Sequence, residues 1–201
     1  MLKKSLFSYL VTSVLCFATM SIRADKLEVA VISTKYGNMV IRFYEDAAPK
    51  HVASFKQHAA NKYYDKTLFH RIVHGFVIQG GDPLSKQEQK SMVGTGGRSA
   101  IFYGVGQKDN PDSWTLPAEF NGKKHVKGTL AMARSHSPDS AGSQFYICLD
   151  RLASLDGQYT VFGELITGQE VLDKIGKLPT DEHDQPLDPI EMTVTIEQRD
   201  V

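Results

Sequence analysis

Short apolar runs separated by turn residues dominate the chain, and several of them alternate with polar positions as half-buried β-strands do. Two such runs, Leu27–Ile32 and Met39–Phe43, flank Tyr36-Gly37-Asn38, which is a hairpin signal. Further runs occur at residues 76–79, 129–133, 144–149, 160–162 and 192–196. The pattern therefore predicts a mainly β protein.

Two segments have helical periodicity instead. Pro49 suits the first turn of a helix, and Val52, Phe55 and Ala59 then fall on one face. A second helix is predicted over residues 168–175, where apolar residues recur at helical spacing. Many short strands with two helices predict a closed antiparallel barrel whose open ends the helices cover. Periodicity alone leaves a β-sandwich as an open alternative.

One long stretch, residues 83–120, contains neither a clear strand nor a helix pattern. It is rich in turn residues and includes Gly94-Thr95-Gly96-Gly97 and the single tryptophan, Trp114. Loops of this length within a compact domain commonly carry function.

The N-terminus has the pattern of a secretory signal peptide. Lys3 and Lys4 precede an apolar run from Leu6 to Met20, and the small residue Ala24 follows. The run is shorter than the ~20 residues that a membrane-spanning helix needs. We therefore expect residues 1–24 to be cleaved, leaving a single domain over 25–201. The expected destination is the periplasm, with secretion as the second choice and no stable membrane association after cleavage.

Charge argues against polyanionic partners. The predicted signal peptide contains three of the 23 basic residues and none of the 23 acidic ones, so the remaining chain has a small net negative charge. Neither nucleic acid nor an anionic membrane is expected to bind it. Only Cys148 remains after cleavage, so no intramolecular disulfide can form, and its apolar neighbours predict a buried, unreactive thiol.

Familiar catalytic motifs are missing. The stretch GTGGRS lacks the spacing and the lysine of a phosphate-binding loop, and Ser143 lies outside a Gly-x-Ser-x-Gly turn. His70 and His74 have metal-like spacing, but no cysteine or carboxylate cluster joins them, so no metal is expected. The other histidines are expected to face solvent. They are His51, His58, His125, His136 and His183.

Residues 69–82, FHRIVHGFVIQGGD, place an arginine, two histidines and a glutamine among large apolar residues. This stretch resembles the signature of cyclophilin-type peptidyl-prolyl isomerases. Three further matches follow in order: GTGGRS (94–99), GTLAMARSHSPDSAGSQFYICL (128–149) and LDGQYTVFGEL (155–165). The similarity runs from about residue 28 to 196. It implies an eight-stranded antiparallel barrel capped by two helices, which decides between the alternatives that periodicity left open.

The chemistry of proline isomerisation suits such a stretch. Rotation about an Xaa–Pro bond is opposed by amide conjugation, with a barrier of about 18–20 kcal/mol. A catalyst needs a hydrogen-bond donor aimed at the proline nitrogen and a dry socket for the ring, but no nucleophile, metal or cofactor. A guanidinium suits the donor role because it keeps its charge in apolar surroundings.

The resemblance assigns roles residue by residue. Arg71 matches the family's catalytic arginine, and Gln79 matches the residue that supports it and holds the substrate backbone. His70 is expected to orient the strand from within. Eight further positions match the family's substrate-binding groove: Phe76, Val77, Ala133, Arg134, Gln144, Tyr146, Leu155 and Tyr159.

Several of these positions depart from the family pattern. Tyr146 stands where many relatives have Phe, and Arg134 replaces a common Asn. Ser154 stands where eukaryotic relatives carry a Trp that binds cyclosporin, and Tyr159 replaces their pocket His. Because serine offers neither the ring surface nor the indole donor, weak cyclosporin binding is expected.

The sequence thus predicts an exported peptidyl-prolyl cis-trans isomerase, a monomer by default, that acts on proline-containing segments of folding proteins. The alternative is a proline-peptide-binding chaperone or adaptor with incidental turnover. Arg71 and Gln79 favour the enzyme, since an apolar socket alone would hold a proline.

Overall fold

The computed structural model describes residues 26–86 and 92–200. The predicted signal peptide, residues 1–24, lies outside the described residues, as does the stretch 87–91 of the long 83–120 segment. Within the described ranges no helix is long and apolar enough to span a bilayer.

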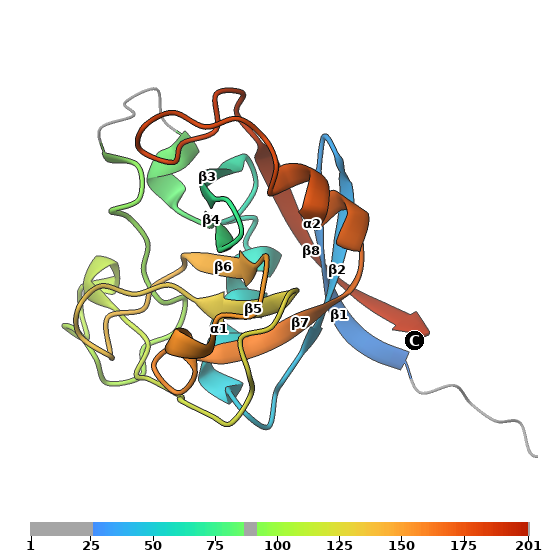
Figure 1. The fold of residues 1–201 in the computed structure, drawn as a ribbon. Helices are drawn as coiled ribbons and strands as arrows, with labels where there is room; N and C mark the ends of the chain where they lie inside the picture. Colours follow the sequence, from blue (N-terminus) through green and yellow to red (C-terminus); the bar gives the residue numbers. More distant parts are fainter. Residues whose placement is uncertain (1–25, 87–91, 201) are drawn as a thin grey trace, which may run out of the picture.

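Eight strands make up the sheet of the described chain (Figure 1). They are β1 (Lys26–Thr34), β2 (Gly37–Phe43), β3 (Thr67–Val73), β4 (Val77–Gly80), β5 (Thr129–Met132), β6 (Phe145–Cys148), β7 (Val161–Thr167) and β8 (Glu191–Asp200).

The strands close into an antiparallel barrel in the order β1-β2-β7-β5-β6-β4-β3-β8. Closure depends on β1 and β8, the first and last strands, which pair without interruption from Lys26↔Asp200 to Thr34↔Met192. This pairing joins the two ends of the sheet, so the barrel is confirmed and the sandwich alternative is wrong.

Two helices cover the barrel, α1 (Pro49–Ala60) and α2 (Gln169–Ile175). Val52, Phe55 and Ala59 of α1 are buried in the same apolar core as the α2 residues that face inward. Both helices therefore contribute apolar side chains to one interior (Figure 1).

Phe55 is the centre of the aromatic part of this core. Its ring lies 5.0 Å from that of Tyr64, 5.4 Å from that of Phe145 and 5.5 Å from that of Phe162. The contacts join α1 to β6 and β7. Helix position and barrel shape are thus set by the same ring packing.

Strand β7 is longer than the apolar pattern predicts. The sequence indicates a strand over 160–162, but β7 continues to Thr167. The first charged residue after the apolar run, Glu164, pairs across the strands with Arg42 and forms an ion pair with it. Cross-strand charge pairs of this kind support a strand without hydrophobic alternation.

The described parts of the long segment, 83–86 and 92–120, include the short 3₁₀ turns η1 (Pro83–Lys86) and η3 (Pro111–Ser113). Buried Leu116 forms an isolated bridge with Ala141. The indole of Trp114 donates to the carbonyl of Gln107, 3.0 Å away. The described part of this segment is therefore held both by its own hydrogen bonds and by its bridge to Ala141.

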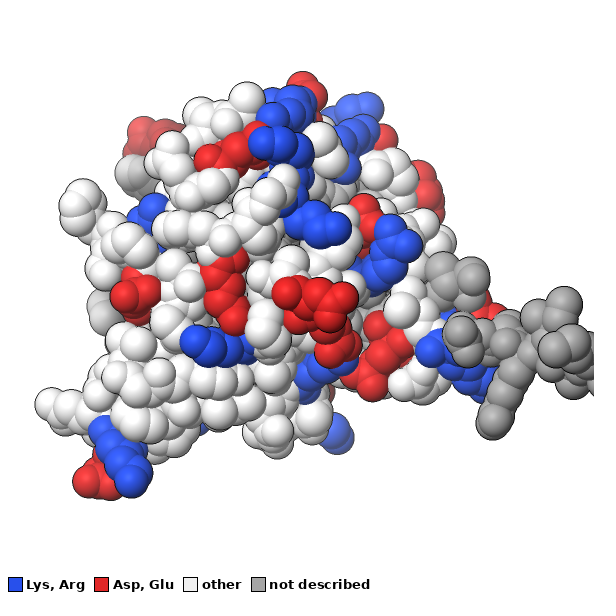
Figure 2. All heavy atoms as spheres, turned by 90° about the horizontal axis from the view of Figure 1, so that it is seen from below, with Lys and Arg blue, Asp and Glu red and all other residues white. Residues whose placement is uncertain are grey.

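The face that Figure 2 shows has both Lys or Arg and Asp or Glu side chains, separated by broad areas without charge. Cys148 is fully buried, and burial raises the pKa of its thiol to about 12. The prediction that this thiol is buried is confirmed.

Three of the five histidines expected to face solvent are buried, which corrects that prediction. His51, His58 and His125 are at most 2% exposed, whereas His136 and His183 are exposed. Each buried ring has a hydrogen-bond partner that offsets part of its desolvation. The sequence could not reveal this because the partners come from segments at least 21 residues away.

His58 on α1 shows what such burial costs. Its Nε2 donates to the carbonyl of Arg98 at 2.8 Å, and its ring stacks on Tyr63. Burial lowers the pKa of His58 to about 4, from the value of about 6.5 that is usual for histidine. The unfolded chain therefore takes up a proton between these values while the folded chain does not, so stability falls with falling pH.

We expect His58→Gln to be less pH-sensitive than the wild type. On going from pH 7.5 to 5, the wild type loses about 2 kcal/mol of unfolding free energy that the variant keeps, because one pKa unit corresponds to about 1.4 kcal/mol. Urea unfolding at both pH values measures the difference. The exposed His136→Gln serves as control and should retain the wild-type slope. Equal slopes in all three proteins would contradict the account.

Candidate active site

The β3–β4 hairpin places Arg71 directly across from Gln79. An irregularity in the pairing between Phe69 and Arg71 shifts the register at this point, so that Phe69 and His70 are both buried while Arg71 is only half-buried. Nη1 of Arg71 donates to Oε1 of Gln79 at 3.5 Å. A local bulge thus turns the guanidinium out of the core and toward its neighbour.

A cavity of about 190 Å³ lies beside this pair. Nine of the ten site residues expected from the sequence line it: Arg71, Phe76, Val77, Gln79, Ala133, Arg134, Tyr146, Leu155 and Tyr159. Its inner wall is apolar, with Val77, Ala133, Tyr146, Leu155 and Tyr159 in one packed cluster. One guanidinium therefore borders a socket made largely of rings and aliphatic groups.

The tenth residue, Gln144, lines a second cavity of about 330 Å³ that adjoins the first and shares Gln79, Ala133 and Arg134 with it. Gln144 accepts from the amide of Gln79 at 3.0 Å. Its own amide donates to the carbonyls of Gly94 and Gly96 at 3.0 and 2.7 Å. The two glutamines thus connect Arg71 to the glycine-rich loop.

Asp82, the last residue of the FHRIVHGFVIQGGD stretch, holds that loop. It is fully buried and accepts from the backbone amides of Leu84, Gly94 and Gly96. A Cβ at Gly96 would lie only 2.4 Å from Asp82 Oδ1, so the close approach requires glycine. Asp82 therefore sets the shape of the second cavity without lining it.

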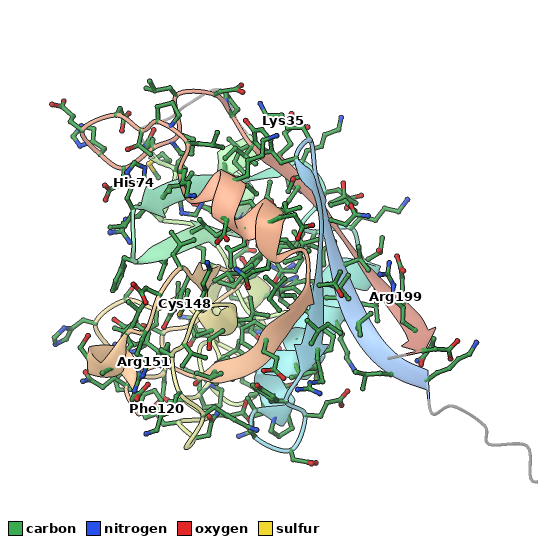
Figure 3. All side chains as sticks on the ribbon, turned by 45° about the vertical axis from the view of Figure 1, so that its right-hand side comes forward. Lys35, His74, Phe120, Cys148, Arg151 and Arg199 are labelled. Atoms are coloured by element: carbon green, nitrogen blue, oxygen red, sulfur yellow. The ribbon has the colours of Figure 1, made fainter. Side chains whose placement is uncertain are left out.

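Behind the apolar wall lies a polar network that starts at Tyr146. The Tyr146 hydroxyl lies 3.0 Å from Nε2 of His125, and Nδ1 of His125 lies 3.2 Å from Asp156. Arg151, labelled in Figure 3, donates to the same carboxylate. The hydrogen bond from Arg151 lowers the pKa of Asp156, and burial lowers that of His125. A neutral His125 that donates to Asp156 and accepts from Tyr146 satisfies all three groups.

Arg71 also has a carboxylate partner from the far end of the chain. Asp184 lies 3.5 Å from Nη2 of Arg71, and the Asp184 carbonyl accepts from the Ile72 amide at 2.8 Å. Asp184 belongs to the segment between α2 and β8. The guanidinium is therefore held on one side by Gln79 and on the other by Asp184.

The histidines of this hairpin point in different directions. His70 is 6% exposed, and within the described residues neither of its ring nitrogens has a hydrogen-bond partner. His74 follows β3, is exposed, and its Nε2 donates to the carbonyl of Leu178 at 3.0 Å (Figure 3). In the ranges that the structure describes, no three histidine, cysteine or carboxylate groups are placed to hold a metal ion.

Comparison with known proteins agrees with this geometry. The sequence profile of the cyclophilin type peptidyl-prolyl cis-trans isomerase family matches residues 29–196. The chain belongs to the cyclophilin family.

Individual relatives support the assignment. A probable peptidyl-prolyl cis-trans isomerase of Brucella melitensis is 39% identical over 154 residues, covering 77% of this chain and 74% of that protein. Peptidyl-prolyl cis-trans isomerase 9 of Schizosaccharomyces pombe is 41% identical over 160 residues, but these are 80% of this chain and only 23% of that protein.

Solved structures agree in fold. A cyclophilin type isomerase of Cryptosporidium parvum, crystallised in the presence of the dipeptide Ala-Pro, superposes with a TM-score of 0.73 at 32% identity. The match covers 85% of this chain and 99% of the other. The closed barrel and its helices are therefore those of a cyclophilin.

Four residues that shape this cyclophilin site were not among those expected from the sequence: Asp82, His125, Asp156 and Asp184. Asp82 could have been found, since it ends the motif that carries Arg71 and Gln79. Asp156 could also have been found, since it follows Leu155 in the LDGQYTVFGEL match. His125 and Asp184 lie outside the matching stretches, and nothing in their own sequence neighbourhoods points to the site.

Proposed function

We propose that this cyclophilin isomerises Xaa–Pro bonds at the cavity bordered by Arg71, and that it acts on exported proteins. The observation that carries the proposal is one guanidinium, held by Gln79 and Asp184, at the edge of an apolar socket of about 190 Å³. The Cryptosporidium parvum isomerase was crystallised in the presence of the dipeptide Ala-Pro, which supports proline as the residue that binds in the socket.

The mechanism is electrostatic. As the amide twists, conjugation is lost and the proline nitrogen regains a lone pair that can accept a hydrogen bond. Arg71 donates to that nitrogen, and the apolar wall excludes water from the ring, which strengthens the interaction. Since the guanidinium needs no reorganisation when the amide twists, it stabilises the twisted state more than the planar one.

The supporting residues fix the direction of this donor. Arg71 Nη1 donates to Gln79, and Nη2 forms the ion pair with Asp184. The other N–H groups of the guanidinium remain available to a peptide. Gln144 and the glycine-rich loop extend the groove along which the peptide backbone lies. No step transfers a proton, and Arg71 stays charged throughout, so activity depends only weakly on pH near neutrality.

The exported setting rests on the predicted signal peptide. The charged start, the apolar run and the small residue at Ala24 support cleavage and passage to the periplasm. Cell fractionation with N-terminal sequencing tests this. A periplasmic protein that begins near Asp25 is expected, and a full-length cytoplasmic protein would refute export while leaving the isomerase proposal intact.

We expect Arg71→Ala to lower kcat/KM for a short Ala-Ala-Pro-Phe peptide by about 10²–10³, the usual loss when one oriented donor to a transition state is removed. Isomerisation measured at low temperature checks this, with the fold verified by circular dichroism. Arg199→Ala, on β8 and far from the hairpin (Figure 3), is the matched control and should keep wild-type activity.

The same experiment separates catalysis from binding. If the wild type binds proline peptides without accelerating their isomerisation, the chain acts as a chaperone or adaptor and the enzymatic proposal fails. If Arg71→Ala retains full activity, the donor assigned here is wrong although the enzyme remains.

Weak cyclosporin binding is proposed from Ser154. This residue is exposed on the short turn η4 (Ala153–Leu155), beside the cavity residue Leu155. We expect Ser154→Trp to tighten cyclosporin binding tenfold or more, because an aromatic anchor adds both buried area and a donor. Titration calorimetry measures it, and Ala153→Trp on the same turn is the control. Tight binding by the wild type would contradict the proposal.

A further inference from the structure

Arg134 stands where the two cavities of the site meet. It lies two residues after the end of β5, is half-buried, and lines both the apolar socket and the adjoining polar cavity. Arg134 replaces an Asn that is common in the family pattern, so this chain places a positive charge at that position.

The Arg134 guanidinium is held rigidly by main-chain carbonyls. Nε and Nη2 donate to the carbonyl of Gln158 at 3.3 and 3.0 Å. Nη1 donates to the carbonyls of Ser135 and His136 at 2.9 and 3.1 Å. The guanidinium carbon also lies 4.5 Å from the centre of the Tyr159 ring. The side chain is therefore oriented before any ligand arrives.

None of these partners carries a charge. Across the described residues no carboxylate lies within ion-pair distance of Arg134, whereas Arg71 has Asp184 at 3.5 Å. Carbonyl acceptors satisfy N–H groups but do not cancel a positive charge. The mouth of the site thus keeps one uncompensated cation, and one N–H of Nη2 has no acceptor among the hydrogen bonds described above.

We propose that Arg134 is a specificity residue that favours prolyl peptides with an acidic side chain adjacent to the proline. The inference rests on the proposed function, because it takes the proline ring to occupy the apolar socket. A proline there must send its neighbours past the rim, where Arg134 lies and where the polar cavity with Ser135, Ser140 and Gln144 begins. A carboxylate at that point gains both charge attraction and the remaining N–H donor.

The expected size of the preference is modest because the rim is open to solvent. Attraction between half-exposed charges is weakened by water and by salt. We expect kcat/KM to be about fivefold higher for a Glu peptide than for its Gln counterpart at low ionic strength. The ratio should shrink toward one at about 1 M salt, where the Debye length falls to about 3 Å.

The test compares peptides that differ only beside the proline. Ala-Xaa-Pro-Phe with Xaa as Glu, Gln or Lys, and a second set with the variable residue after the proline, are followed by NMR exchange. In the wild type, kcat/KM should be higher for the Glu peptide than for the Gln peptide, and higher for the Gln peptide than for the Lys peptide, in at least one set. In Arg134→Gln the three kcat/KM values should become equal. Arg134→Lys keeps the positive charge, so it should still favour the Glu peptide, but by a smaller ratio.

Arg199→Gln removes a distant arginine and should leave the order unchanged, which excludes an effect of net charge alone. Unfolding midpoints of all variants verify that they fold. Equal rates for Glu, Gln and Lys peptides in an active wild type would overturn the inference and leave the proposed function standing. If no peptide is accelerated, the proposed function fails, and the dissociation constants of the same peptides then decide the inference, with equal values overturning it.

Discussion

Pairing between the first and last strands is the constraint on which the rest of this cyclophilin depends. Because β1 and β8 pair along their full described length, the sheet has no free edge at that seam, and every other strand is fixed between two neighbours. The short strand β4, only four residues long, could not hold a site by itself. It is held in place by β3 on one side and β6 on the other.

That frame explains how a half-buried guanidinium keeps one orientation. Arg71 is on β3, its partner Gln79 is on β4, and Asp184 arrives from the segment before β8. The hydrogen bonds continue from Gln79 to Gln144 and from Gln144 to the glycine-rich loop. Buried Asp82 holds this loop by accepting from its backbone amides. Each contact is a modest polar interaction, but together they restrict the guanidinium to a narrow range of positions, as the proposed electrostatic mechanism requires.

Hydrogen bonds behind the apolar wall of the socket also fix the position of one of its rings. The ring of Tyr146 lines the socket, and its hydroxyl forms a hydrogen bond with His125. His125 forms a second hydrogen bond with Asp156. A phenylalanine would form the same wall with no polar anchor, so this chain fixes the ring by hydrogen bonding as well as by packing. The burial of the histidine costs stability at low pH, since burial lowers its pKa.

The sequence by itself determined the strand and helix pattern, the site stretch around Arg71 and Gln79, and, through its resemblance, nine residues that meet in one cavity. These follow from local periodicity and contiguous motifs. Only the tertiary structure decided how the barrel closes, where β7 ends, and that His51, His58 and His125 are buried. It also placed Asp184 beside Arg71 and, among the residues that the structure describes, no carboxylate within ion-pair distance of Arg134. Those features depend on contacts between segments far apart in the chain, and neither propensity nor spacing encodes which distant groups will meet when the barrel closes.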